Sequence, residues 1–197
     1  MDILAHSLWA AAAAATARRN VRVSIWRTAW WGIFPDIVSL GPIALFDGLA
    51  ALENDSGFWQ EFWHTQYEPA TTLGADVLAA TPILYSATHS IFFFAACFGL
   101  FYLIRKRLLP RYRLEGKISP VPWELMGWFL HIVLDIGTHS ADFYPTPFLW
   151  PFFSWTVSGI NWTNQVFATV NYGILAVIGI IFYAQWRKRR VLKIEII

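Results

Sequence analysis

Residues 131–142 carry two histidines and two aspartates within twelve positions of an otherwise apolar part of the chain. If this segment is helical, Asp135 and Asp142 lie within about 40° of His131 on one face, and His139 lies about 80° from it at the edge of that face. The His-x-x-x-Asp spacing brings an imidazole and a carboxylate side by side, and both are ligand types for Zn²⁺. Such groups are costly inside an apolar helix unless they are paired or bound. The pattern therefore favours a metal site, and a hydrogen-bonded polar patch between helices is the alternative.

Other apolar segments offer polar residues that could meet this face. Asp36 lies in GIFPDIV, His89 in ATHSI, and His6 near the start of the chain in AHS. Counted from the nearest basic residue at about 1.5 Å per helical residue, these groups and the His131–Asp135 pair lie about 14 to 27 Å into a membrane. Taken singly, they have ordinary explanations as a surface histidine, a helix cap after a proline, or a hydrogen-bonded core histidine. Their similar depth favours one site, with these metal-ligand candidates: His6, Asp36, His89, His131, Asp135 and His139.

Mixed histidine and carboxylate ligands suit Zn²⁺ best, with Mn²⁺ or Fe²⁺ as further possibilities. The candidates outnumber the four ligands of a structural zinc ion. Either two ions are bound, or one ion keeps an open position while spare groups act as a base or orient the ligands. Asp36 is the first candidate for a catalytic base and Asp142 the second. The single Cys97 excludes a cysteine-rich cluster.

The composition predicts what kind of scaffold holds these residues. Of the 197 residues, 56% are hydrophobic and 14% are charged, which is typical of a polytopic membrane protein. We expect an all-α helical bundle that forms a single integral-membrane domain over residues 1–197, with about five transmembrane helices. The expected spans are roughly Ile3–Ala17, Ser24–Ala51 (interrupted by prolines), Val77–Ile104, Val121–Thr138 and Val166–Trp186.

The basic residues predict how these spans are oriented. All 15 lysines and arginines fall within Arg18–Arg27, Arg105–Lys117 and Arg187–Lys193, while the stretch Glu53–Asp76 is acidic and has none. With five crossings the three basic segments share one side, which the positive-inside rule places in the cytoplasm. The N-terminus is then outside and the C-terminus is cytoplasmic. The basic tail is interpreted as a topology anchor rather than a nucleic-acid patch.

The short motifs also resemble those of a known family. Ala5-His-Ser7, Phe34-Pro-Asp36, Thr88-His-Ser90 and the segment from Leu130-His-Ile-Val-Leu-Asp135 to Leu149-Trp-Pro151 occur in the order and spacing of the membrane-bound metal-dependent hydrolases. This family includes the LexA-regulated inner-membrane hydrolases, and more remotely the pattern is similar to the zinc-dependent phospholipase C and nuclease superfamily. The resemblance covers roughly residues 5–151. It implies an all-helical metal site and an inner-membrane location, with His139 and Asp142 matching a variant ending of the motif.

The sequence therefore predicts a membrane-embedded hydrolase that uses a divalent metal, most simply zinc. Its substrate would be an ester or phosphoester of a lipid or amphipathic molecule, and its partners would be membrane lipids and not nucleic acid. A metal-ion carrier or channel is one alternative, because a polar stripe can line an ion path. A haem-binding bundle with His89 and His131 as axial ligands is another.

Overall fold

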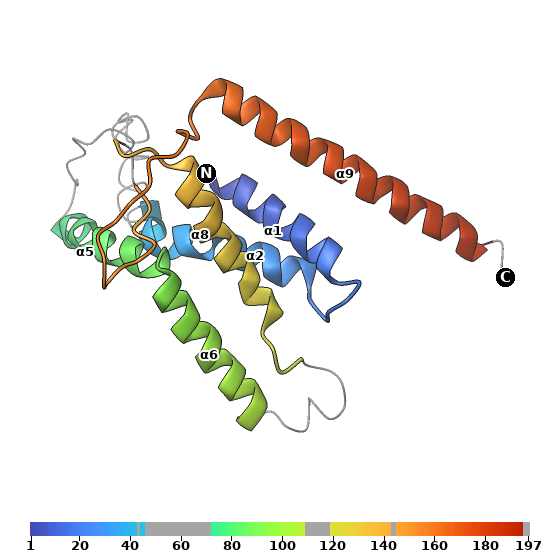
Figure 1. The fold of residues 1–197 in the computed structure, drawn as a ribbon, viewed down its shortest axis with the longest axis horizontal. Helices are drawn as coiled ribbons and strands as arrows, with labels where there is room; N and C mark the ends of the chain where they lie inside the picture. The colour runs from blue at the N-terminus through green and yellow to red at the C-terminus, as the bar shows by residue number, and fades with distance from the viewer. Residues whose placement is uncertain (43, 46–71, 109–118, 143–144, 195–197) are drawn as a thin grey trace.

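The computed structural model describes residues 1–42, 44–45, 72–108, 119–142 and 145–194, which form helices joined by loops (Figure 1). The elements, in chain order, are α1 (Ile3–Ala17), α2 (Ile25–Ser39), α5 (Thr72–Thr88), α6 (Ile91–Leu108), a short 3-10 helix η1 (Trp123–Leu125), α8 (Met126–Thr138) and α9 (Gln165–Ile194). Side chains cap the first two helices. Asp2 accepts a hydrogen bond from the Ala5 amide at 3.0 Å, and Ser24 accepts one from the Arg27 amide at 3.4 Å.

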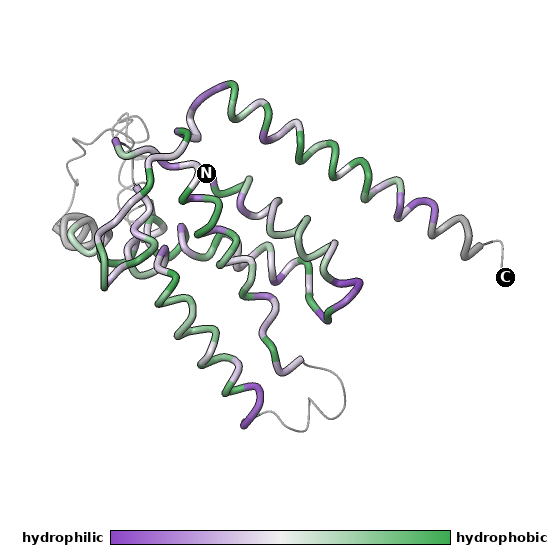
Figure 2. Tube along the Cα trace, in the orientation of Figure 1, coloured by the Kyte–Doolittle hydropathy of each residue, from purple (hydrophilic) through white to green (hydrophobic). Residues whose placement is uncertain are grey.

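The basic residues gather at one end of this bundle. Arg27, at the start of α2, and Arg105, near the end of α6, both pair with Glu124 in η1, just before α8, at 3.8 and 3.1 Å. Arg19, just after α1, donates a hydrogen bond to Gln185 near the end of α9 at 3.0 Å. Figure 2 shows these hydrophilic stretches at the bottom end of α6, at the turn after α1 and near the right end of α9, away from the N-terminus. We call this the basic end of the bundle.

Two glycines allow the central helices to approach closely. A Cβ atom on Gly127 of α8 would lie 2.1 Å from the Thr28 carbonyl oxygen of α2. A Cβ atom on Gly32 of α2 would lie 2.7 Å from the Ala10 Cβ of α1 and 3.0 Å from the His6 carbonyl oxygen. Small residues at such crossings are typical of packed membrane helices. The two contacts hold α1, α2 and α8 together as the centre of the bundle.

Aromatic side chains fill the space between α2, α6 and α8. Trp128 is buried and stacks on Trp31 with the ring planes 8° apart, and it meets Phe94 edge to face. Leu125 and Ile132 complete the buried cluster. Trp128 also donates from its indole nitrogen to the Thr88 carbonyl oxygen at 2.6 Å. The same residue therefore packs the core and fixes the end of α5.

The third expected span is broken where a single helix was predicted. The helix direction changes by 65° between the segments Ala79–Thr88 and Ile91–Leu108. Residues from the loop after α8 hold this break, because the Ile91 amide donates to the Phe148 carbonyl oxygen at 3.0 Å and the Ser90 hydroxyl donates to the Trp150 carbonyl oxygen. The break places His89 between the two helices, where its ring points into the bundle.

Pro35 does not interrupt α2, which continues to Ser39. The Leu40 amide donates to the Asp36 carbonyl oxygen at 2.8 Å, so Asp36 lies within the helix and does not cap a helix start. The alternative explanation of Asp36 as a cap is therefore wrong.

Within the described ranges, α9 is the one helix that is long and apolar enough to cross a membrane by itself, over Gln165–Lys188. The bent pair Ala79–Thr88 and Ile91–Leu108 passes the same test only when it is taken together, and α1 is apolar but shorter. The prediction of an all-α fold is confirmed for the described residues. The number of crossings is taken up below with the proposed function.

Candidate metal centre

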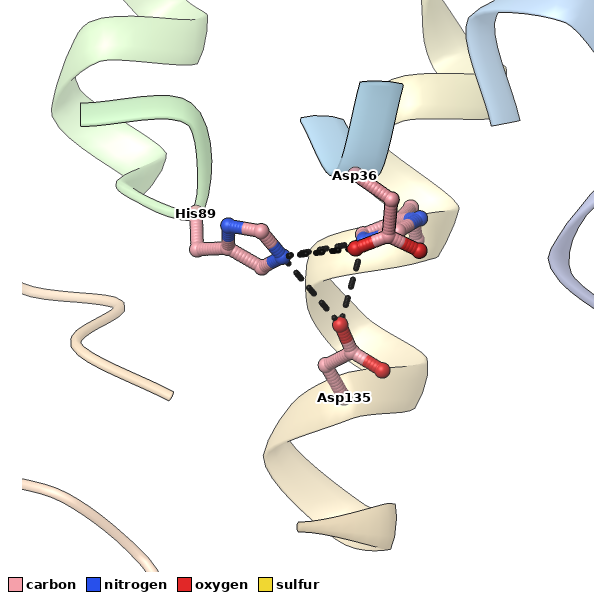
Figure 3. Close-up of side chains that lie close together, drawn as sticks. Asp36, His89 and Asp135 are labelled. Carbon is pink, nitrogen blue, oxygen red and sulfur yellow. Dashed lines mark hydrogen bonds and ion pairs between the residues drawn. The ribbon is translucent and has the colours of Figure 1, made fainter. Parts of the chain in front are cut away.

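Asp36, His89, His131 and Asp135 bring one ligand atom each to a common point in the buried centre of the bundle. The side chains come from α2, from the α5–α6 break and from α8 (Figure 3). The Nε2 atoms of His89 and His131 lie 3.0 Å apart. Asp135 Oδ2 lies 3.0 Å from His131 Nε2 and 3.4 Å from His89 Nε2. Asp36 Oδ1 is farther out, at 3.6 Å from His131 Nε2 and 3.7 Å from His89 Nε2.

Backbone carbonyls determine which ring nitrogens carry protons. His131 Nδ1 lies 2.7 Å from the Gly32 carbonyl oxygen, and His89 Nδ1 lies 2.9 Å from the Tyr85 carbonyl oxygen. A carbonyl oxygen only accepts, so both Nδ1 atoms must donate. In the neutral rings both Nε2 atoms then carry lone pairs that face each other and two carboxylates. Four acceptors then converge, and either a metal ion or a proton held among them would satisfy them.

Asp135 uses its second oxygen for a different set of contacts. Asp135 Oδ1 lies 2.9 Å from His6 Nε2, 3.3 Å from His139 Nε2 and 2.6 Å from the α-amino nitrogen of Met1. The His6 ring also stacks on the His131 ring, with the centroids 3.7 Å apart. One oxygen of Asp135 therefore faces His89 and His131 in the cluster, and its other oxygen faces His6 and His139.

Several atoms at this centre are buried without a hydrogen bond. They are Asp135 Oδ2 and both ring nitrogens of His6, whose contact with Asp135 Oδ1 is close but not in hydrogen-bond geometry. Buried polar atoms are nearly always satisfied in folded proteins, so several unsatisfied polar atoms at one place are what a site for an ion or a water molecule requires. The unpaired oxygen of Asp135 is the one that faces His89 and His131.

The sequence-predicted residues fall into three groups. His131, Asp135, His89 and Asp36 meet directly, and His6 and His139 contact the other oxygen of Asp135. Asp142 lies exposed in the turn after α8, outside the cluster. It does not share the helix face of His131 as expected, because α8 ends at Thr138 and His139 is extended. The acidic stretch Glu53–Asp76 falls largely outside the described residues.

Sequence reasoning missed two partners of the histidines. The Gly32 carbonyl oxygen orients His131, and the Tyr85 hydroxyl lies 3.2 Å from His139 Nδ1. A backbone carbonyl leaves no trace in residue types. Tyr85 stands one helical turn before His89, on the same face of α5, and its ring stacks on the His89 ring with the centroids 4.0 Å apart.

The geometry also bears on the haem alternative. Two axial histidines must stand on opposite faces of a macrocycle. The Nε2 atoms of His89 and His131 are 3.0 Å apart and are flanked by Asp135, which leaves no room for a porphyrin between the rings. The cluster fits a small ion instead.

Comparison with known proteins places this chain in a family. No curated protein and no solved structure matches it. A family model described as YdjM inner membrane protein matches residues 80–197, more than half of the chain. This range contains His89, His131, Asp135 and His139, whereas His6 and Asp36 precede it. The chain belongs to the YdjM inner membrane protein family.

Proposed function

We propose that this inner-membrane protein is a metal-dependent hydrolase that acts on an ester or phosphoester of a lipid or amphipathic substrate. The observation that carries the proposal is the buried convergence of His89 Nε2, His131 Nε2, Asp135 Oδ2 and Asp36 Oδ1. Four nitrogen and oxygen ligands at about 2.0–2.1 Å around a tetrahedral ion stand about 3.3 Å from one another. The separations among His89, His131 and Asp135, 3.0 to 3.4 Å, are close to that value, and those to Asp36 are longer, at 3.6 and 3.7 Å. Zinc fits this donor set best, with Mn²⁺ and Fe²⁺ as alternatives.

The four groups divide naturally into three ligands and a base. His89, His131 and Asp135 form the tight part of the cluster, with separations of 3.0 to 3.4 Å. Asp36 stands at 3.6 and 3.7 Å, and its side chain is 9% exposed against 0–1% for the other three. Catalytic zinc sites commonly use three protein ligands and leave one position open. We assign Asp36 to that open side, as the group that accepts the proton from the attacking water.

The remaining contacts hold the ligands in place. The carbonyl oxygens of Gly32 and Tyr85 fix the ring orientations of His131 and His89, and His6 and His139 hold the far oxygen of Asp135. A divalent ion bound there would acidify a water molecule and polarise the substrate oxygen. Asp36 would then need only to take up a proton at its carboxylate.

We place this centre in a bundle of five crossings, formed by α1, α2, the bent α5–α6 pair, α8 and α9, as one domain over residues 1–197. The helices α1, α2, α6, α8 and α9 run between the metal centre and the basic end, and α5 joins α6 at the break beside the centre. Met1 and His139 lie at the centre, Arg19 and Arg105 lie at the basic end, and α9 contacts Asp2 at one end and Arg19 at the other. With the basic end in the cytoplasm the site lies in the outer half of the membrane, where a lipid-like substrate could reach it. The N-terminus is then outside and the C-terminus inside.

One observation favours a hydrolase over an ion carrier. A transport path needs ligands along the membrane, but the acidic residue recorded at the basic end, Glu124, is paired with Arg27 and Arg105. The described metal-capable cluster lies at the opposite end of α8. Among the described residues, this separation supports a single site better than an ion path through the membrane.

The test is a hydrolysis screen of the zinc-loaded full-length protein in nanodiscs against lipid esters and phosphoesters. His131→Ala should lose metal and turnover together. Asp36→Asn should keep its metal while turnover falls by about 10²–10⁴-fold, as is usual when a general base is removed. If Asp142→Asn abolishes turnover and Asp36→Asn does not, the base is Asp142. A loaded wild-type protein that cleaves none of these substrates but equilibrates zinc across a liposome would be a carrier.

A further inference from the structure

A groove of about 590 Å³ lies between α1 and α9, away from the metal centre. Small residues line it on the α1 side, namely Ala11, Ala12 and Ala15, and Gly179 and Phe182 face them from α9. Arg18 and Arg19 close its basic end. Its volume is in the range that holds a ligand of several hundred daltons.

The groove stays open because α9 is fixed at both of its ends. Near the metal centre, Trp9 donates to Asn171 at 2.8 Å, and the Tyr172 hydroxyl donates to Asp2 at 2.6 Å. At the other end Arg19 donates to Gln185 at 3.0 Å. Alanine and glycine normally let membrane helices approach closely, but here they leave space between the two fixed ends. The two helices run side by side along this space in Figure 1.

The lining changes character along the groove. Alanines, Leu175, Ile178 and Phe182 make most of it apolar, while its basic end carries two guanidinium groups beside the amide of Gln185. Trp186 stands at the same end, as tryptophans do at the membrane interface. A ligand that matches this gradient has a hydrocarbon chain and an anionic head.

We infer that the α1–α9 groove binds one anionic phospholipid, with an acyl chain along the alanine face of α1 and the phosphate between Arg18 and Arg19. The protein belongs to an inner-membrane family, so its α9 surface faces lipid, and only 11% of the α9 span is buried. Basic pockets between membrane helices characteristically select acidic lipid heads. The inference does not depend on the metal centre or on the proposed hydrolysis.

The test compares phosphatidylglycerol with phosphatidylcholine of identical acyl chains, added to delipidated full-length protein and measured by native mass spectrometry. We expect one phosphatidylglycerol to remain bound, in preference to phosphatidylcholine. Arg18→Gln and Arg19→Gln should each lower that preference by about fivefold, since one basic residue contributes roughly that factor. Arg107→Gln, which removes a basic residue from the end of α6 outside the groove, should not change it.

A second pair of variants tests the apolar part of the groove. A side chain at Gly179 would enter open space and fill the groove, and one at Gly173 would enter open space on the same helix but outside the groove. Gly179→Phe should therefore displace the lipid, and Gly173→Phe should not. Equal binding of both lipids, unchanged binding in Gly179→Phe, or a second copy of the chain cross-linked into the groove would overturn the inference.

Discussion

His89 and His131 face each other through their Nε2 atoms at 3.0 Å, while the Nδ1 atom of each ring donates to a backbone carbonyl oxygen. Protonating both Nε2 atoms would place two imidazolium rings against each other. If neither Nε2 atom is protonated, two nitrogen lone pairs face each other beside the Asp135 carboxylate. Only a shared proton or a metal ion resolves this arrangement, and the two possibilities make different predictions.

Metal content distinguishes the ion from the proton. Protein purified from native membranes should carry at least one transition-metal ion per chain, and His131→Ala and Asp135→Ala should carry none. The reason is that each variant removes one of the three tight ligands. Elemental analysis measures this directly. Equal and negligible metal in the wild type and both variants would leave the shared proton as the occupant.

Chelation should destabilise the wild-type protein. An ion that binds only the folded state adds about 2.7 kcal/mol at a hundredfold excess over its Kd, and for a chain of this size each kcal/mol moves Tm by about 2–4 °C. Thermal unfolding in detergent, with and without a chelator, gives the shift. His131→Ala is the matched control, because its Tm should not respond to the chelator. A wild-type Tm that also fails to respond would argue against a bound ion.

His6→Ala should weaken metal binding without abolishing it. His6 contacts the far oxygen of Asp135 at 2.9 Å and stacks on His131, so it orients two ligands from outside the cluster of four. Loss of such support typically costs 10–100-fold in affinity. Competition against a chelator of known affinity measures it. A loss as complete as that of His131→Ala would instead make His6 a direct ligand, as the sequence pattern suggests.

Gly127→Ala should destabilise the bundle. Its Cβ would lie 2.1 Å from the Thr28 carbonyl oxygen and 3.0 Å from the Gly32 amide, so α2 and α8 would have to separate. Overpacking of this kind costs about 1–3 kcal/mol. The separation would also move the Gly32 carbonyl oxygen away from His131 Nδ1, so metal affinity should fall as well. Gly173→Ala, which has open space at its Cβ, should show neither effect in the same thermal and metal assays.

Labelling of intact cells tests the five-crossing topology. In a Cys97→Ser background, Asp142→Cys lies in the turn next to the metal centre and Asn20→Cys lies in the loop between α1 and α2. A membrane-impermeant maleimide should label the first from outside and the second only after lysis, because the proposed topology places the basic end in the cytoplasm. Labelling of both positions in intact cells would contradict the topology.

The sequence alone determined the contacts that depend only on helix geometry. His131 and Asp135 are one helical turn apart, and the prediction that their side chains meet is confirmed by a separation of 3.0 Å. The bounds of α1 were also predictable, because Asp2 caps an apolar run that ends before Arg18. Periodicity and local capping act within a few residues, and they can therefore be found in one stretch of sequence.

Tertiary contacts decided the rest. α8 ends at Thr138, which removes Asp142 from the shared face, because the Ile160 and Trp162 amides bind the carbonyl oxygens of Gly137 and Thr138 in place of the next helical turn. The break at His89 likewise depends on the carbonyl oxygens of Phe148 and Trp150, about sixty residues away. The close crossings at Gly32 and Gly127 bring the three helices together so that Asp135 turns Oδ2 toward His131 and Oδ1 toward His6. The end of α8 and the break at His89 depend on the backbone groups of distant residues, which every residue type carries, so the order of side chains could not reveal them.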